Sequence, residues 1–202
     1  SYIGTDLTIT IAESAPGTGD GGSIKLVGTL IDDFYQGFES ITFADGTIWN
    51  AATIRAQAIQ AVQTSGNDTI VGFNSNEIYV GGLGNDVING GNGNDTYVYA
   101  RGDGHDIFTD TRGNGTADKL VFADINAGDF SLSYVGIDLT ITIAESAPGA
   151  GNGGSVKLAG TLIDDFRQGI ESIEFADGTI WNAATIRAQA IQAVQTSGND
   201  TI

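Results

Sequence analysis

Glycine and aspartate recur with a nine-residue period over residues 81–95, which read Gly-Gly-Leu-Gly-Asn-Asp-Val-Ile-Asn-Gly-Gly-Asn-Gly-Asn-Asp. The stretch follows the pattern G-G-x-G-x-D-x-U-x, in which U is a large apolar residue. Glycines allow a tight turn to adopt positive φ and to aim its carbonyl oxygens inward. The aspartate adds an anionic oxygen, and calcium prefers this ligand set. The pattern therefore predicts calcium binding, and each x-U-x triplet predicts a short strand with one buried side chain.

The nonapeptide register continues on both sides of this pair. Residues 66–71 fill the second half of an earlier repeat, and residues 72–80 form a degraded one. After a two-residue insertion, residues 101–108 restore the register, and a looser echo lies at 115–120. The acidic positions are Asp68, Glu77, Asp86, Asp95 and Asp106, and the apolar positions are Ile70, Tyr79, Ile88, Tyr97 and Phe108.

These residues resemble the RTX family, the repeats of haemolysin-type secreted bacterial proteins. The resemblance implies a right-handed parallel β-roll with calcium between turns on the same side, that is, between repeats i and i+2. The implied carboxylate pairs are Asp68 with Asp86, Glu77 with Asp95, and Asp86 with Asp106. The implied remaining ligands are Gly66, Gly81, Gly82, Gly84, Gly90, Gly91, Gly93 and Asp103. Phe73 and Ser75 replace glycines and Glu77 is longer than aspartate, so we expect the Glu77/Asp95 site to be the weakest.

The chain also contains a long duplication. Residues 1–70 and 133–202 align without a gap, and 61 of 70 positions are identical. Self-similarity of this kind indicates a tandem array, of which the chain holds about one and a half 132-residue periods. We therefore expect the chain to be part of a longer protein.

The remainder of each period predicts β strands and one helix. Alternating segments at 6–12, 23–27 and 39–43 predict half-buried strands, and Asn50 is a plausible N-cap. The sequence Phe-Ala-Asp-Gly-Thr-Ile-Trp, at 43–49 and 175–181, resembles the haemolysin-related domain that often follows RTX repeats, which implies a cap over the open end of the roll. The expected fold is mostly β, a parallel β-roll flanked by β-strand capping units with one short helix per period. The expected parts are a capping unit at 1–49, a helix at 50–63, the roll at 64–110, a second capping unit at 111–182, a helix at 183–195 and the start of the next roll at 196–202.

Composition limits the possible partners. The net charge of −17 repels nucleic acid phosphates and anionic lipids and attracts divalent cations. The chain has no cysteine, so calcium would replace disulfides as the stabilising crosslink. No apolar run approaches the roughly 20 residues of a membrane span. We expect calcium as the cofactor, no nucleic acid, no membrane insertion and, from the family resemblance, a secreted or cell-surface location in a bacterium.

Catalytic motifs have little support. His105 is the only histidine and lies in a variable turn, so no histidine-based catalytic group recurs in the repeat. The paired acids Asp32–Asp33 and Asp164–Asp165 indicate solvated turns or auxiliary calcium ligands, because successive strand residues face opposite ways. The adhesion-like tripeptide at 101–103 fills an inserted turn, which favours a chance match. We expect a protein that is not an enzyme.

Three functional classes fit these observations. The first is a calcium-binding structural repeat of a long secreted or surface-attached protein, such as a fibre, adhesin or matrix component, which folds and stacks end to end on calcium binding. The second is a calcium-triggered secretion or folding appendage of an RTX toxin or secreted hydrolase. The third is a carbohydrate- or receptor-binding module. Nearly identical 132-residue units favour the first class, because repetition provides reach and multivalency.

Overall fold

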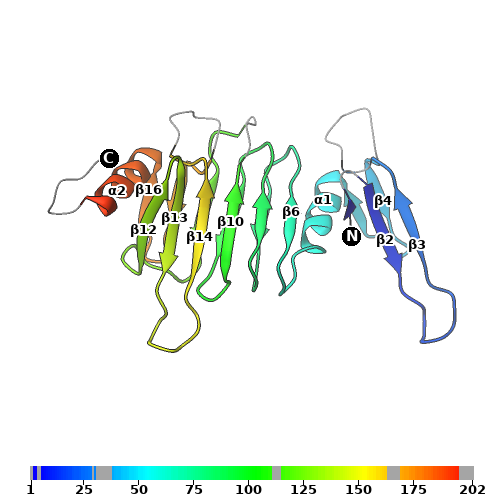
Figure 1. Cartoon of the computed structure of the whole chain (residues 1–202). Coiled ribbons are helices and arrows are strands. Elements are labelled where there is room, and N and C mark those ends of the chain that lie inside the picture. The colour runs from blue at the N-terminus through cyan, green and yellow to red at the C-terminus, as the bar shows by residue number, and fades with distance from the viewer. Residues whose placement is uncertain are drawn as a thin grey trace. The chain divides into compact units, whose positions relative to one another are not determined.

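The computed structural model describes residues 2–3, 6–28, 30, 38–110, 115–162 and 169–195. The chain divides into two compact units, Ser1–Val62 and Gln63–Ile202, which are described separately below and coloured along the chain in Figure 1. The start of a next roll at 196–202 and the acidic pairs Asp32–Asp33 and Asp164–Asp165 lie outside the described residues.

The first unit contains a three-stranded antiparallel sheet, a hairpin and a helix. The sheet has the order β1-β2-β3, and β4 pairs with β5. The elements are β1 (Tyr2–Ile3), β2 (Asp6–Ile11), β3 (Gly22–Leu26), β4 (Ser40–Thr42), β5 (Ile48–Asn50) and α1 (Ala51–Gln60). Asn50 is the N-cap of α1, because its side chain accepts a hydrogen bond of 2.9 Å from the Thr53 amide. The helix ends at Gln60, three residues before the limit expected from the sequence.

The second unit begins with a parallel β-roll whose strands alternate between two sheets. One sheet contains β6 (Thr69–Val71), β8 (Val87–Asn89) and β10 (His105–Thr109), and the other contains β7 (Ile78–Val80), β9 (Thr96–Tyr99) and β11 (Lys119–Phe122). Each strand pairs in parallel with the strand two positions along the chain. Register places Ile70 beside Ile88 and Ile88 beside Phe108, so successive apolar positions stack. This arrangement confirms the predicted mostly β fold with a parallel roll.

The roll core consists of the apolar residue of each nonapeptide. Ile70, Tyr79, Ile88 and Tyr97 have 0% exposure, whereas their neighbours within each strand are exposed or half-buried. The ring of Tyr97 lies 5.5 Å from that of Tyr79 and 5.1 Å from that of Phe108, measured between centroids. The Tyr97 hydroxyl forms hydrogen bonds with backbone groups near the turns. It accepts one from the Gly90 amide at 2.9 Å and donates one to the Thr109 carbonyl at 2.9 Å.

The cap continues the same sheets. β14 (Gly154–Ala159) pairs in parallel with β10, and β15 (Ser172–Glu174) pairs in parallel with β11. The outer strands then run antiparallel, namely β12 (Phe130–Val135) and β13 (Asp138–Ile143) in one sheet and β16 (Ile180–Asn182) in the other. Figure 1 shows β12, β13, β14 and β10 as neighbouring strands. The ladders therefore extend beyond residue 110, where the sequence analysis placed the end of the roll.

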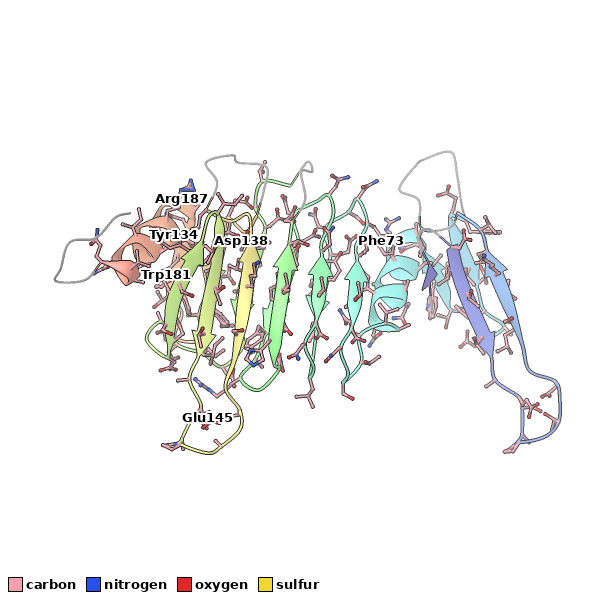
Figure 2. The ribbon with its side chains drawn as sticks, viewed as in Figure 1. Phe73, Tyr134, Asp138, Glu145, Trp181 and Arg187 are labelled. Carbon is pink, nitrogen blue, oxygen red and sulfur yellow. The ribbon has the colours of Figure 1, made fainter. Side chains whose placement is uncertain are left out.

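An aromatic cluster and a helix complete the cap. Phe130 stacks on Phe175 with centroids 5.3 Å apart, and Trp181, labelled in Figure 2, packs edge-on against Phe175 at 4.9 Å. Helix α2 (Ala183–Val194) follows β16 directly and packs against β12, β15 and β16. Asn182 caps its N-terminus by accepting a hydrogen bond from the Thr185 amide. The cap thus has its own apolar core in addition to its strand pairing with the roll.

Candidate metal centre

The acidic position of each repeat is tied to the acidic position two repeats earlier. The Asp86 Oδ1 atom accepts a hydrogen bond from the Asp68 amide at 2.8 Å, and the Asp106 Oδ1 atom accepts one from the Asp86 amide at 2.9 Å. On the other edge of the roll, the Asp95 Oδ1 atom accepts from the Glu77 amide at 2.8 Å. The structure therefore places the two residues of each pair implied by the RTX resemblance in hydrogen-bonding contact, from the backbone amide of one to the carboxylate of the other.

The second of these columns continues into the cap. The Asp118 Oδ1 atom accepts from the Asp95 amide at 2.6 Å, and the Glu171 Oε2 atom accepts from the Asp118 amide at 2.7 Å. Sequence analysis named neither residue as a ligand. Asp118 was visible only as the acid of the looser echo at 115–120. Glu171 gave no signal, because 53 residues separate it from its partner.

The turn glycines let neighbouring turns approach closely. Gly82, Gly91 and Gly102 have φ of 84°, 94° and 96°, and Gly84, Gly93 and Gly104 have φ of 128°, 114° and 126°. A Cβ atom on Gly84 would lie 2.5 Å from the Gly66 carbonyl oxygen, and one on Gly82 would lie 2.9 Å from the Thr64 carbonyl oxygen. Carbonyl oxygens of one turn thus face the glycines two repeats on, where any larger residue would collide with them.

Two carboxylate oxygens in these columns are buried without a hydrogen-bond partner. They are the Oδ2 atoms of Asp86 and Asp95, and both residues have 0% exposure. Gly81 and Gly90 make room for these atoms, because a Cβ atom on Gly81 would collide with Asp86 Oδ2 and one on Gly90 with Asp95 Oδ2. An isolated buried charge is costly, so anionic oxygens next to turn carbonyls fit a hard cation such as calcium.

Burial shifts the titration of the same groups. It raises the pKa of Asp95 and of Asp106 to about 7, and neighbouring carboxylates reinforce both shifts. Burial also raises the pKa of Asp86, with the Asp68 charge adding to the effect. The folded roll without metal therefore disfavours the ionised carboxylates, and a bound cation supplies the charge that stabilises them.

The remaining expected ligands are held differently. The Glu77 carboxylate accepts bonds from the Ser75 hydroxyl, from the Tyr79 hydroxyl at 3.2 Å and from the Phe73 amide at 3.4 Å. Asp68 accepts from the Thr64 amide at 2.6 Å, and Asp103 accepts from the Ala100 amide at 2.7 Å. Protein donors thus bind oxygens of these three carboxylates, whereas Asp86 and Asp95 each also have a buried oxygen, Oδ2, with no hydrogen-bond partner.

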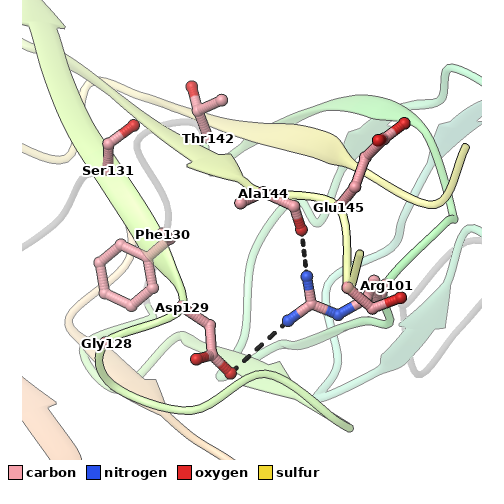
Figure 3. A pocket seen from close by; sticks show the side chains of 9 residues that line it. Arg101, Gly128, Asp129, Phe130, Ser131, Thr142, Ala144 and Glu145 are labelled. Carbon is pink, nitrogen blue, oxygen red and sulfur yellow. Dashed lines mark hydrogen bonds and ion pairs between the residues drawn. The ribbon is translucent and has the colours of Figure 1, made fainter. Parts of the chain in front are cut away.

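The adhesion-like tripeptide does not present its arginine to solvent. The Arg101 side chain is 12% exposed, forms a 3.5 Å ion pair with Asp129 and donates to the Ala144 carbonyl oxygen (Figure 3). These contacts lie in a cavity of about 590 Å³ within the cap and the adjoining turn. Arg101 therefore ties the last turn of the roll to the cap. His105 is exposed, with its Nδ1 atom 2.9 Å from the Ser155 hydroxyl.

Parallel turns that stack buried carboxylates against glycine carbonyls define the protein as a calcium-binding β-roll. A sequence model of the RTX calcium-binding nonapeptide repeat (4 copies) matches residues 64–87 and 71–106. A model of the haemolysin-type calcium binding protein related domain matches residues 6–53 and 138–185. Comparison with curated proteins gave no significant match. The chain therefore belongs to the RTX family, with haemolysin-type related domains on both sides of its repeats, and its cofactor is calcium.

Removing the charge of Asp86 should lower calcium affinity more than removing the charge of Glu77. Asp86 belongs to two proposed sites and has an unpaired buried oxygen, so Asp86→Asn should weaken calcium affinity by roughly 10- to 100-fold. Glu77→Gln should cost less than about tenfold, because protein donors already hold its carboxylate. Titration calorimetry measures both, with Asp177→Asn, an exposed turn residue of the cap, as the control. Equal losses, or a larger loss at Glu77, would show that the pairing is wrong.

Stability without calcium should depend on pH in a defined direction. Asp95 and Asp106 have a folded pKa of about 7, above the unfolded value of 3.8, so the folded roll binds more protons than the unfolded chain between these limits. The free energy of unfolding should therefore fall as pH rises from about 4 to about 7. Circular dichroism in chelator from about pH 4 to about pH 7 measures this trend as a loss of β-structure with rising pH, and an increase in β-structure across that window would contradict it. With calcium, protons compete with the ion, so apparent calcium affinity should fall as the pH falls through 7.

Proposed function

We propose that this chain is a calcium-binding structural repeat of a long secreted or surface-attached bacterial protein, such as a fibre, adhesin or matrix component. In this proposal the repeat folds and stacks end to end when calcium binds, and its role is mechanical rather than catalytic. The observation that carries the proposal is a difference between the two copies of the cap, which have nearly the same sequence. One copy pairs a strand with the last strand of the roll, and the corresponding strand of the other copy has no such partner among the described residues.

The second copy of the cap is built into the roll. The Ser155 amide of β14 donates to the Gly104 carbonyl at 2.9 Å, and five residue pairs join β14 to β10. Val156 and Leu158 of β14 have 0% exposure. The cap therefore ends the roll by adding a strand to its ladder, and this covers the exposed backbone groups of β10.

The first copy presents the same strand without that partner. Within the described part of the chain, β3 is an edge strand that pairs only with β2. Ile24 of β3 is 48% exposed, whereas its counterpart Val156 in β14 has 0% exposure. The two copies differ little in sequence, so the exposed edge of β3 fits the last strand of another roll of the same kind.

A tandem array supplies such a roll before every cap. The cap and helix recur at the 132-residue spacing, and residues 196–202 repeat the start of the roll, so one type of interface could join all successive units of such an array. A head-to-tail contact of this type produces open filaments unless its rotation happens to close a ring. In the proposed function, such a filament extends over a long distance and presents many copies of the same unit.

The chemistry of the chain agrees with an extracellular setting. RTX repeats supply calcium sites, and extracellular calcium sites typically have dissociation constants on the order of 10⁻⁴ to 10⁻³ M. With no cysteine in the chain, calcium is the available crosslink. Neither of the two described helices, with 10 and 12 residues, is long and apolar enough to cross a membrane.

Sedimentation velocity and small-angle scattering of the chain in calcium test this function. We expect concentration-dependent association into elongated particles by domain swapping, in which the β3 edge of one molecule displaces β14, a strand of nearly the same sequence, from the roll of another. Ile24→Lys should abolish association, since docking would bury its charge. Val135→Lys, at a site 84% exposed, should associate as the wild type does.

Two outcomes would contradict the proposal. A strictly monomeric wild type in saturating calcium would favour the alternative, a calcium-triggered secretion or folding appendage of a toxin or hydrolase. Equal association of Ile24→Lys and the wild type would show that contacts through another surface join the molecules.

A further inference from the structure

We propose a further calcium site at the junction of roll and cap, formed by Asp95, Asp110 and Asp118 with Glu171 beside them. Asp110 and Asp118 lie outside the residues matched by the nonapeptide and cap families. The inference rests on calcium binding by the roll and does not depend on whether units stack into a fibre.

Strand order brings these acids together. Asp95, Asp118 and Glu171 immediately precede β9, β11 and β15, which are neighbours in one sheet. Asp110 immediately follows β10 in the other sheet. The group therefore lies where both sheets of the roll meet the cap.

The three aspartates can present oxygens to a single ion. One carboxylate oxygen from each of Asp95, Asp110 and Asp118 lies within 4.8 Å of the others, and the residues have exposures of 0%, 7% and 2%. The basic side chains with ion pairs in the described part of this unit, Arg101, Lys119 and Lys157, pair with other carboxylates. Three buried carboxylates at this separation repel one another strongly unless a cation or protons neutralise them.

An unpaired buried oxygen points independently to a ligand. Asp95 Oδ1 accepts from the Glu77 amide, but Asp95 Oδ2 is buried with no hydrogen-bond partner. A Cβ atom on Gly90 would collide with both Asp95 Oδ2 and the Tyr97 hydroxyl, which places these two groups on the same side of Gly90. The Tyr97 hydroxyl lies 3.4 Å from Asp110 Oδ2. Asp95 Oδ2 thus faces the side of the cluster where Asp110 lies.

The cap segment before β15 is attached to the same group. The Glu171 Oε2 atom accepts from the Asp118 amide at 2.7 Å, and the Glu171 amide donates to the Asp118 carbonyl at 2.9 Å. The Gly169 amide donates to the Asp110 carbonyl at 3.4 Å. An ion held by the three aspartates would therefore couple cap docking to completion of the last turns of the roll.

The duplication supplies a matched control for this site. Glu39 in the first copy corresponds to Glu171 in the second, and the Glu-Ser-Ile tripeptide is the same at both positions. Glu39 is exposed, whereas Glu171 is half-buried. Glu39→Gln removes the same charge from the same local sequence without touching the junction.

Titration calorimetry and hydrogen exchange of the whole chain test the site, with calcium as the probe. Asp110→Asn should remove one bound calcium per chain or raise its dissociation constant at least about tenfold. In saturating calcium, its amides at 69–99 should stay protected while those at 169–174 lose protection. Glu171→Gln should shift the same readouts in the same direction, and Glu39→Gln should match the wild type.

Unchanged stoichiometry, affinity and exchange in Asp110→Asn would overturn the inference, because the acids would then be neutralised by shared protons alone. If Asp110→Asn fails to fold in calcium, Glu171→Gln decides by the same two measurements. The inference would also be overturned if Asp86→Asn bound less calcium than the wild type while Asp110→Asn and Glu171→Gln bound the same amount. All calcium ions would then lie within the nonapeptide turns.

Discussion

The rest of the structure depends on one electrostatic constraint, the burial of carboxylates in columns along the edges of the roll. Asp86 and Asp95 are fully buried, and each retains an oxygen with no hydrogen-bond partner. Apart from residues 72–80, which bury both Phe73 and Tyr79, each nonapeptide buries a single large apolar side chain. One such side chain is little to offset the conformational entropy of ordering nine residues. We therefore expect that neutralisation of the carboxylates by calcium makes folding of the roll favourable, so that metal binding becomes part of the folding free energy.

The cap addresses a second constraint, the open end of a parallel sheet. β14 and β15 extend both ladders of the roll, and antiparallel neighbours then follow them outward. These pairings provide hydrogen-bond partners for the backbone groups of β10 and β11. The aromatic cluster around Phe175 gives the cap an apolar core of its own. The cap recurs in the first unit with β3 as an edge strand of its described sheet, and in the proposed array this edge would pair with the last strand of another roll.

Much of this fold could be predicted from the local periodicity of the sequence. The nonapeptide phase predicted the buried series from Ile70 to Phe108, because glycine, acid and apolar positions recur at fixed spacing. The acidic residues at the junction of roll and cap, Asp110, Asp118 and Glu171, could not be predicted as a group from this periodicity, for a physical reason. Glu171 meets Asp118 only through pairing of β15 with β11, across 53 residues, and pairing so distant leaves no periodic mark in the sequence. The end of the roll was similarly hidden, since β14 alternates like any half-buried strand and its parallel partner β10 lies far away in sequence.

Circular dichroism combined with hydrogen exchange, in calcium and in excess chelator, tests the central claim most directly. The account predicts that chelator removes β-structure and amide protection from residues 64–122. It also predicts that calcium on the order of 10⁻⁴ to 10⁻³ M restores both. A spectrum and an exchange pattern unchanged by chelator would contradict it, because the buried carboxylates would then be stable without a cation.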